Sequence, residues 1–205
     1  QGSLMVGFNR RFSPHSVKVK SYLSDTPINV IATMNAGDIP PEVWVHDMGN
    51  GGGRIIGEAC HFIDLISYFT GSKIVSVCMN ALGTSPKQNT DNATILLKYE
   101  NGSSGVINYF SNGSKKYAKE RVEVYSQNRT FVIDNFIKTT AYGQSGFSKL
   151  KTALDKGHQS QFKNYLQSIE KEGKSLIAAD SLINTTQASF AALQSLAAKS
   201  WIHIE

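Results

Sequence analysis

The chain has 205 residues, 40% of them hydrophobic and 18% charged, which is enough apolar material to bury one substantial core. No apolar stretch approaches the roughly 20 residues that a membrane-spanning helix needs. The start of the chain also lacks the basic and apolar regions of a signal peptide. The net charge of +5 is scattered, without a basic stripe interleaved with aromatic residues, so neither a membrane nor a nucleic acid is an expected partner.

Cys60 and Cys78 are the only cysteines. Two cysteines are too few for a disulfide framework in a domain of this size, and they form no C-x-x-C motif. We therefore expect a reducing compartment, the cytoplasm. Residues 1–3 are typical of the remnant of a cleavable tag, so we expect one domain over residues 4–205.

The first quarter of the chain predicts two strands separated by a helix. The apolar run Leu4 to Asn9 favours a short strand. Ser13 and Pro14 are typical of a helix N-terminus. The β-branched run Ile28 to Ala36 predicts the second strand. The long segment Gly37 to Gly53 is expected to be an irregular loop, and loops of that length are usually functional or disordered.

Three consecutive glycines then lead into a helix predicted over Arg54 to Thr70. Its apolar residues recur at helical spacing and predict a buried stripe. The stripe consists of Ile55, Ala59, Phe62, Leu65, Ile66 and Phe69. Gly71 is a typical C-terminal stop.

The rest of the sequence predicts β-hairpins and two closing helices. Strand patterns cover residues 73–82, 92–100, 103–111, 121–126, 130–134 and 137–143. Asn101 and Gly102 favour a type I′ turn. The first closing helix, His158 to Lys171, has an apolar face of Phe162, Tyr165, Leu166 and Ile169. The second, capped by Asp180 and ending at Lys199, has a face of Leu182, Ile183, Thr186, Phe190, Leu193 and Leu196.

This order of elements predicts an α+β fold, with a mainly antiparallel, open-faced sheet and helices packed on one face. The strands do not alternate with helices, so no Rossmann domain is expected in this chain. The glycine run lacks the spacing of both phosphate-binding loop motifs and is not expected to cradle a nucleotide. The second face of the sheet is left to water or to another subunit.

Glu58 and His61 are three residues apart on the predicted helix, and Asp64 continues the same row. A neighbouring carboxylate raises the pKa of an imidazole and orients it, which suits proton transfer near neutral pH. A solvated polar stripe on a surface helix would explain the spacing too. A metal site would need His46 or Asp47 as a further ligand, and without an H-E-x-x-H pattern no metal is expected.

Other polar candidates lie at strand ends and in the long loop. Arg10 and Arg11 suit a carboxylate or a phosphate, although surface ion pairing explains them equally well. Asn35 ends the second predicted strand. Trp44 suits stacking on a sugar ring or plugging the core, and His158 begins a closing helix.

Taken together, the features resemble the C-terminal domain of the glucose–fructose oxidoreductase / inositol dehydrogenase (Gfo/Idh/MocA) family. The likeness runs from VGFNRRFSP through MNAG to DKGH and the two closing helices. Its most specific part is the glycine run followed by H-x-x-D-L at His61, Asp64 and Leu65. The segment GRIIGEACHFIDL resembles a branch that is sometimes fused behind a zinc-alcohol-dehydrogenase-like half.

The resemblance implies a dihydrodipicolinate-reductase-like C-terminal domain that binds a sugar or cyclitol, such as an inositol, and dimerises through its open sheet. NAD or NADP would be held by an N-terminal Rossmann domain of the parent chain, and no cofactor is expected to bind this chain. His61 is the implied catalytic acid/base. Glu58 is its implied companion, because the Asp that stands four residues before this His in many members is Gly57 here. The implied substrate-binding residues are Asn35, Trp44, Arg54, Arg11 and Asp64.

The function expected from the resemblance is that of an NAD(P)-dependent dehydrogenase, carried out by the full-length protein and not by this chain alone. The cofactor performs the hydride chemistry, and its site is expected in the absent half. Two alternatives stay open. One is an NAD-dependent glycosidase relative with the same fold, and the other is a non-catalytic binding or assembly module.

Overall fold

The structure is a computed structural model that describes residues 4–170 and 175–204; the expected tag remnant lies outside them. The strands of its sheet are β1 Asn29–Asn35, β2 Ile74–Ala81, β3 Asn92–Tyr99, β4 Ser104–Phe110, β5 Glu120–Ser126, β6 Arg129–Asp134, β7 Lys138–Tyr142, β8 Lys149–Lys151 and β9 Ile202–His203. The α-helices are α1 Pro14–Lys20, α2 Cys60–Thr70, α3 His158–Glu170 and α4 Ala179–Ala198. Three shorter helical turns are η1 Asn9–Phe12, η2 Trp44–His46 and η3 Ile55–Ala59.

The strands of the described residues form one sheet in the order β8-β7-β6-β5-β1-β4-β3-β2-β9. Strand β1 lies in its middle. It runs parallel to β4, with Ala32 opposite Ile107, and antiparallel to β5, with Ala32 opposite Val122. Every other pairing in the described chain is antiparallel. The prediction of a mainly antiparallel sheet is therefore confirmed.

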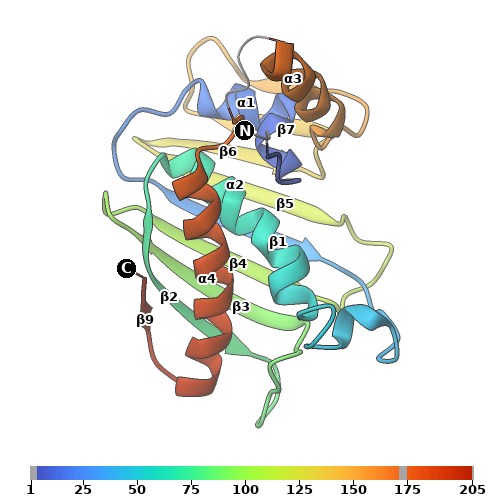
Figure 1. Ribbon diagram of the computed structural model, residues 1–205. Helices are drawn as coiled ribbons and strands as arrows, with labels where there is room; N and C mark the ends of the chain where they lie inside the picture. Colours follow the sequence, from blue (N-terminus) through green and yellow to red (C-terminus); the bar gives the residue numbers. More distant parts are fainter. Residues whose placement is uncertain (1–3, 171–174, 205) are drawn as a thin grey trace.

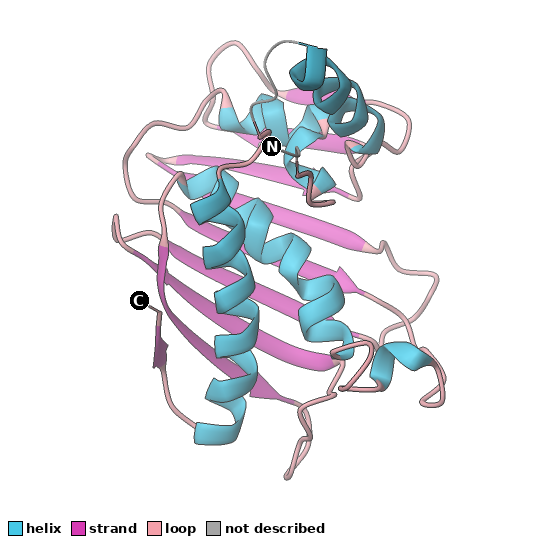
Figure 2. Ribbon diagram, viewed as in Figure 1, coloured by secondary structure: helices cyan, strands magenta, loops and turns pink. Residues whose placement is uncertain are grey.

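The helices cover one face of this sheet. Figure 1 shows α2 and α4 side by side across the sheet, with α1 and α3 near the β6–β7 end. Figure 2 shows the strands as a single layer behind the helices. The other face carries no helix of the described chain, so the predicted open-faced architecture is also confirmed. None of the described helices is long and apolar enough to span a bilayer.

The predicted stripe of α2 forms the centre of the core. Phe62, Leu65, Ile66 and Phe69 are fully buried against the alternate residues of the strands. Burial of each such side chain stabilises the fold by about 1.5–3 kcal/mol. The helix ends at Gly71, whose φ of +64° is the left-handed conformation expected of a glycine stop.

The predicted strand over Leu4 to Asn9 is wrong. Residues 4–8 are irregular and lead into η1, where Phe8 and Asn9 donate backbone hydrogen bonds to Val6 and Gly7. These bonds join residues two apart, and residues 4–8 pair with none of the described strands. The turn η1 that follows packs against Gly157, whose φ is +88° and whose position leaves no room for a side chain beside η1.

The helix predicted over Arg54 to Thr70 is confirmed, although it begins with the π-helical turn η3 before α2. One turn prediction is wrong. The turn at Asn101-Gly102 is not type I′, because only Gly102 has a positive φ, of 83°. Paired positive φ values occur instead at residues 127–128 and 135–136, where the next two hairpins turn.

The closing helices have the predicted positions, but their buried faces differ in part from the predicted ones. Helix α4 buries Leu182 and Leu193 of its predicted face together with small side chains, whereas Ile183 and Phe190 are about half exposed. The buried set of α4 is Leu182, Thr185, Ala188, Ser189, Ala191, Ala192, Leu193 and Ser195. Its N-cap is Ala178, so Asp180 is not the cap and lies within the first turn. Strands β8 and β9 had no sequence prediction.

Candidate functional site

A cavity of about 430 Å³ opens where α2, η1 and the start of α3 meet. It gathers segments that are far apart in the sequence, because η1 packs against both α2 and α3. The apolar part of its lining includes Met5, Met34 and Phe162. The polar part consists of Asn9, Arg10, Glu58, His61, Lys119, Lys156, His158 and Gln161.

Glu58 and His61, whose spacing predicted that they share one side of the helix, both line this cavity. Glu58 lies in the π-helical turn η3, and His61 lies in the first turn of α2. A π-helical turn is rare and often marks a functional site. The sequence pair is therefore a wall of one cavity, not a solvated surface stripe.

His61 is held by packing and lacks a hydrogen bond on one nitrogen. The edge of its ring meets Phe8 at 5.8 Å between centroids and 82° between planes. Its Nδ1 is buried and has no partner in the described chain. Burial and the charge of Arg10 lower the pKa of His61 to about 4, outweighing Glu120 and Glu58. Glu58 raises this pKa, as expected of a neighbouring carboxylate, but burial is the larger effect and the net shift of the pKa is downward.

The carboxylate of Glu58 is held in place by two hydrogen-bond donors. Tyr109 Oη donates a hydrogen bond of 2.6 Å to Oε2, and Arg54 Nε donates one of 3.2 Å to Oε1. Burial alone would raise the pKa of Glu58, but these donors outweigh it and lower the pKa. None of the hydrogen bonds in the described chain joins Glu58 to His61. Glu58 is thus an ionised acceptor beside a neutral imidazole.

A buried ion cluster contributes Arg10 and Lys156 to the lining of the cavity. Arg10 binds Glu120 through Nε at 2.8 Å and Nη2 at 3.0 Å, and Lys156 Nζ lies 2.5 Å from the same carboxylate. Burial would raise the pKa of Glu120, but the two cations lower it. Two cations on one carboxylate leave a net positive charge beside His61.

Three of the other predicted site residues lie outside the cavity lining. Arg54 is buried and donates hydrogen bonds to the carbonyl of Gly37 and the carboxylate of Asp91. It also contacts Glu58, and these bonds hold it in place to position that carboxylate. Arg11 binds Asp64 through two hydrogen bonds, of 2.9 and 2.5 Å, and Asp64 is fully buried. This pair joins η1 to α2.

Asn35 and Trp44 also lie away from the lining. Asn35 donates hydrogen bonds to the carbonyls of Ser114 and Tyr117, which fixes the loop before β5. Trp44 belongs to η2 and is 69% exposed, so it does not plug the core. The substrate contacts predicted for these two residues, and for Arg54, Arg11 and Asp64, stay predictions.

The described residues contain no group of three or more His, Cys, Asp or Glu side chains placed to hold a metal ion. The two loop residues considered as metal ligands, His46 and Asp47, contact groups within their own loop. His46 Nε2 lies 3.3 Å from the carbonyl of Ile39, and Asp47 accepts hydrogen bonds from Gly49 and Asn50.

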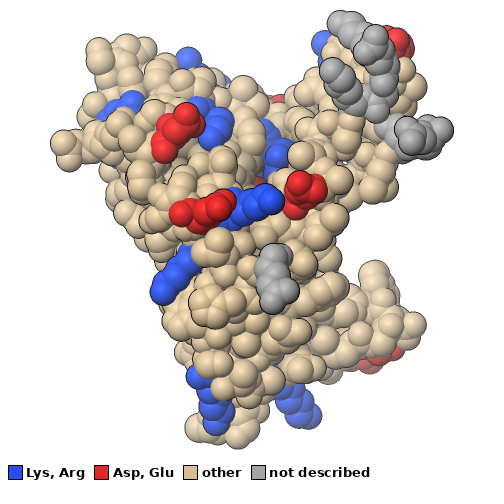
Figure 3. All heavy atoms as spheres, turned by 60° about the vertical axis from the view of Figure 1, so that its left-hand side comes forward, with Lys and Arg blue, Asp and Glu red and all other residues tan. Residues whose placement is uncertain are grey.

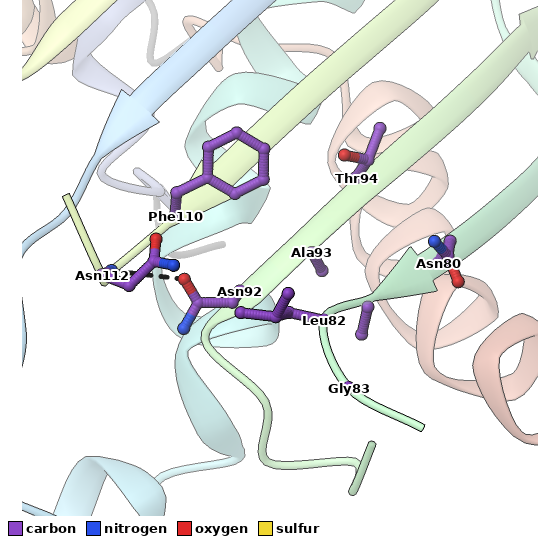
Figure 4. A pocket seen from close by; sticks show the side chains of 9 residues that line it. Asn80, Leu82, Gly83, Asn92, Ala93, Thr94, Phe110 and Asn112 are labelled. Carbon is purple, nitrogen blue, oxygen red and sulfur yellow. Dashed lines mark hydrogen bonds between the residues drawn. The ribbon is translucent and has the colours of Figure 1, made fainter. Parts of the chain in front are cut away.

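A second hollow, of about 530 Å³, lies on the open sheet face near the ends of β2, β3 and β4. Figure 4 shows Asn80, Leu82, Thr94 and Phe110 around it, with the backbone N–H of Asn112 bonded to Asn92. No titratable side chain lines this hollow. It therefore offers contact surface but no group for proton transfer.

Charge on the surface gives no sign of a nucleic-acid site on the side seen in Figure 3. Lysine and arginine side chains are few there and alternate with acidic ones. A nucleic-acid interface requires a continuous basic patch.

A dinucleotide site does not fit the residues of this chain. Gly51 lies directly against the backbone of Trp44 and Val45, so the glycine run is filled by its own loop and presents no open cradle. Arg54, at the start of the following helix, is neutralised by Glu58 and Asp91.

Sequence reasoning missed Glu120 and Tyr109. Both lie on the helix-covered face of the sheet. Glu120 shares that face of β5 with Val122 and Val124, and Tyr109 shares that face of β4 with Ile107. A charged residue at such an inward position requires a buried partner. That alternation was the available signal, but it does not name the partner, Arg10, which lies 110 residues away.

Comparison with known proteins supports an oxidoreductase domain. A family model described as GFO/IDH/MocA C-terminal domain matches residues 24–132. The uncharacterized oxidoreductase YrbE of Bacillus subtilis is 30% identical over 176 residues, covering 83% of this chain and 50% of that protein. Inositol 2-dehydrogenase of Rhizobium meliloti is 24% identical over 188 residues, covering 87% of this chain and 55% of that protein.

The fold has solved counterparts as well. The NAD binding oxidoreductase from Klebsiella pneumoniae superposes with a TM-score of 0.81 at 16% identity, covering 99% of this chain and 66% of the other. At that identity the match shows the fold alone. An open, mainly antiparallel sheet with one helical layer is therefore the fold that this chain shares with the matched oxidoreductase structure. The family match is more specific: this chain belongs to the GFO/IDH/MocA C-terminal domain family. It spans about half the length of the curated relatives it matches.

Proposed function

We propose that this chain is the substrate-binding and proton-transfer half of an NAD(P)-dependent oxidoreductase that acts on a hydroxyl group of a sugar or cyclitol. The observation that carries the proposal is the shared cavity of Glu58 and His61. The proposal is supported by the relatives named oxidoreductase and inositol 2-dehydrogenase.

The two side chains have different roles in the proposed reaction. His61 is neutral at pH 7 because its pKa is about 4, so it accepts the proton of the substrate hydroxyl. Glu58 stays ionised, so it accepts a hydrogen bond from a neighbouring hydroxyl and stabilises the imidazolium that forms. Arg54 and Tyr109 position Glu58 for this task.

The nucleotide half of the reaction is proposed to lie in a Rossmann domain of the parent chain. This chain alone is then expected to bind neither NAD nor NADP and to turn over no substrate. Isothermal titration of the chain with each nucleotide tests this expectation. Micromolar binding of either one would overturn it.

The role of His61 is tested in the full-length parent, against a panel of cyclitols and neutral sugars. We expect His61→Ala to reduce turnover by roughly 10²-fold or more, because general acid/base groups contribute that much. His203→Ala, at an exposed position of β9, is the matched control. Undiminished activity in the His61 variant would instead favour a binding or assembly module, and release of sugar from glycosides would favour the glycosidase relative.

We also propose that the parent dimerises through the open sheet face. That face carries three large apolar or aromatic side chains that are each more than one-third exposed, namely Leu96, Phe110 and Tyr125. Sedimentation equilibrium tests the proposal: Leu96→Asp should yield monomers, whereas Ile183→Asp on α4 should not. A Leu96→Asp protein with an unchanged mass would exclude this face.

The proposed location is a reducing compartment, the cytoplasm. Cys60 and Cys78 are free thiols in the structure. Burial raises the pKa of Cys60 to about 11, which keeps that thiol unreactive.

A further inference from the structure

Helix α3 exposes an apolar stripe that its own domain does not cover. Phe162, Leu166 and Ile169 are 59%, 54% and 50% exposed. Their i, i+4 and i+7 spacing places them on one helical face. The sequence pattern predicted an apolar face here, and in this domain that face is left available to a partner.

The composition and anchoring of α3 agree with an interface. Only Lys163 and Glu170 are charged in the helix, whereas a solvent-facing helix normally carries many charges. Gln161 is its only buried residue in the described structure, and its side-chain amide donates a 2.7 Å hydrogen bond to the carbonyl of Val6. A helix of this length with so little burial has marginal stability of its own.

The stripe begins at the candidate active site. Phe162 lines the cavity that holds His61 and Glu58, and Leu166 and Ile169 lie one and two turns further along the helix. Met5 and Gly7 line the same cavity, and Figure 1 shows the described N-terminal segment beneath α3. Any chain that precedes this segment in a longer parent thus emerges beside the stripe.

We propose that the stripe Phe162-Leu166-Ile169 is the docking surface for the nucleotide-binding half of the parent chain. This inference rests on the proposed function. The relatives extend well beyond this chain, which spans 50% and 55% of the two curated ones. A domain that packs on the stripe closes the open side of the cavity. It brings its bound nucleotide to the same rim as His61.

Hydroxyl-radical footprinting of the parent and of this chain alone tests the inference. We expect a several-fold loss of labelling at Phe162, Leu166 and Ile169 in the parent. Phe190, a half-exposed aromatic on the outer side of α4, is the reference residue. Equal labelling of the stripe in both proteins overturns the inference. Protection that appears in this chain alone and grows with its concentration also overturns it, because a second copy is then the occupant.

A pair of variants provides an independent readout. Leu166→Asp and Ile169→Asp should leave the melting temperature of this chain unchanged, because both side chains already face water. In the parent the same variants should restore labelling of Phe162, whereas Ile183→Asp should not. These outcomes do not depend on turnover. A protected stripe in an inactive parent refutes only the proposed function, and an active parent with an unprotected stripe refutes only this inference.

Discussion

Tyr109 donates a 2.6 Å hydrogen bond from the middle of the sheet to Glu58 at the edge of the cavity. Tyr109 is fully buried in β4, and its hydroxyl reaches the carboxylate that Arg54 contacts from the helix side. Strand β4 lies beside β1 at the centre of the sheet, so a central strand positions the cavity carboxylate. Burial raises the pKa of Tyr109 far above its ordinary value, so the hydroxyl remains a donor.

Removal of that donor is expected to change the titration of Glu58. Tyr109→Phe should raise the pKa of Glu58 and destabilise the fold by about 1.5–3 kcal/mol, the usual contribution of a hydrogen bond to a charged group. Carboxyl-carbon NMR titration and urea unfolding measure the two effects. Tyr125→Phe is the control, because Tyr125 bonds Glu123 in the same way on the open face, where little stability is expected. Equal costs for both variants would contradict the positioning role.

His61 is expected to make stability depend on pH. Its pKa is about 4 in the folded protein, against an ordinary value of 6.5, so the unfolded chain takes up the proton first. The stabilising contribution is complete above pH 6.5 and is lost as pH falls towards 4, by up to a few kcal/mol. Urea unfolding across this window should show a smaller pH slope in His61→Gln than in the wild type. An unchanged slope would mean that the imidazole is not buried in solution.

Gly57 allows the missing companion of His61 to be added. A Cβ at this position meets only the carbonyl oxygen of Gly51, at 3.9 Å, so a side chain fits. Gly57→Asp places a carboxylate one helical turn before His61 and should raise the pKa of the imidazole, since an opposite charge favours its protonated form. Histidine NMR titration measures the change. Gly57→Asn controls for shape, and an equal shift in that variant would rule out a charge effect.

The buried pair of Arg11 and Asp64 is expected to be costly to break. Burial outweighs Arg11 and raises the pKa of Asp64 to about 6. Loss of Arg11 alone, in Arg11→Met, should destabilise the fold by roughly 3–5 kcal/mol, because the carboxylate is left buried without its cation. The double variant Arg11→Met/Asp64→Leu should recover most of that stability, as measured by thermal unfolding. A double variant as unstable as the single one would show that the pair has a further structural role.

The local elements were readable from the sequence because they depend on periodicity. The residues Ile55 to Phe69 repeat at helical spacing, and β-branched runs such as Ile28 to Ala36 alternate, so each pattern predicts its own backbone and its own buried face. The placement of Glu58 and His61 on the same side of the helix was predictable for the same reason, since residues three apart on a helix are neighbours.

Long-range pairing and burial required the tertiary structure. Three features depend on contacts between segments that are far apart in the sequence. They are the parallel pairing of β1 with β4, the cluster of Arg10, Glu120 and Lys156, and the irregular path of residues 4–8. Burial also reversed the expected pKa shift of His61, because desolvation depends on all the segments that enclose the ring. Local spacing determined which side chains share a helix or strand face, and only the assembled core decided what those faces touch.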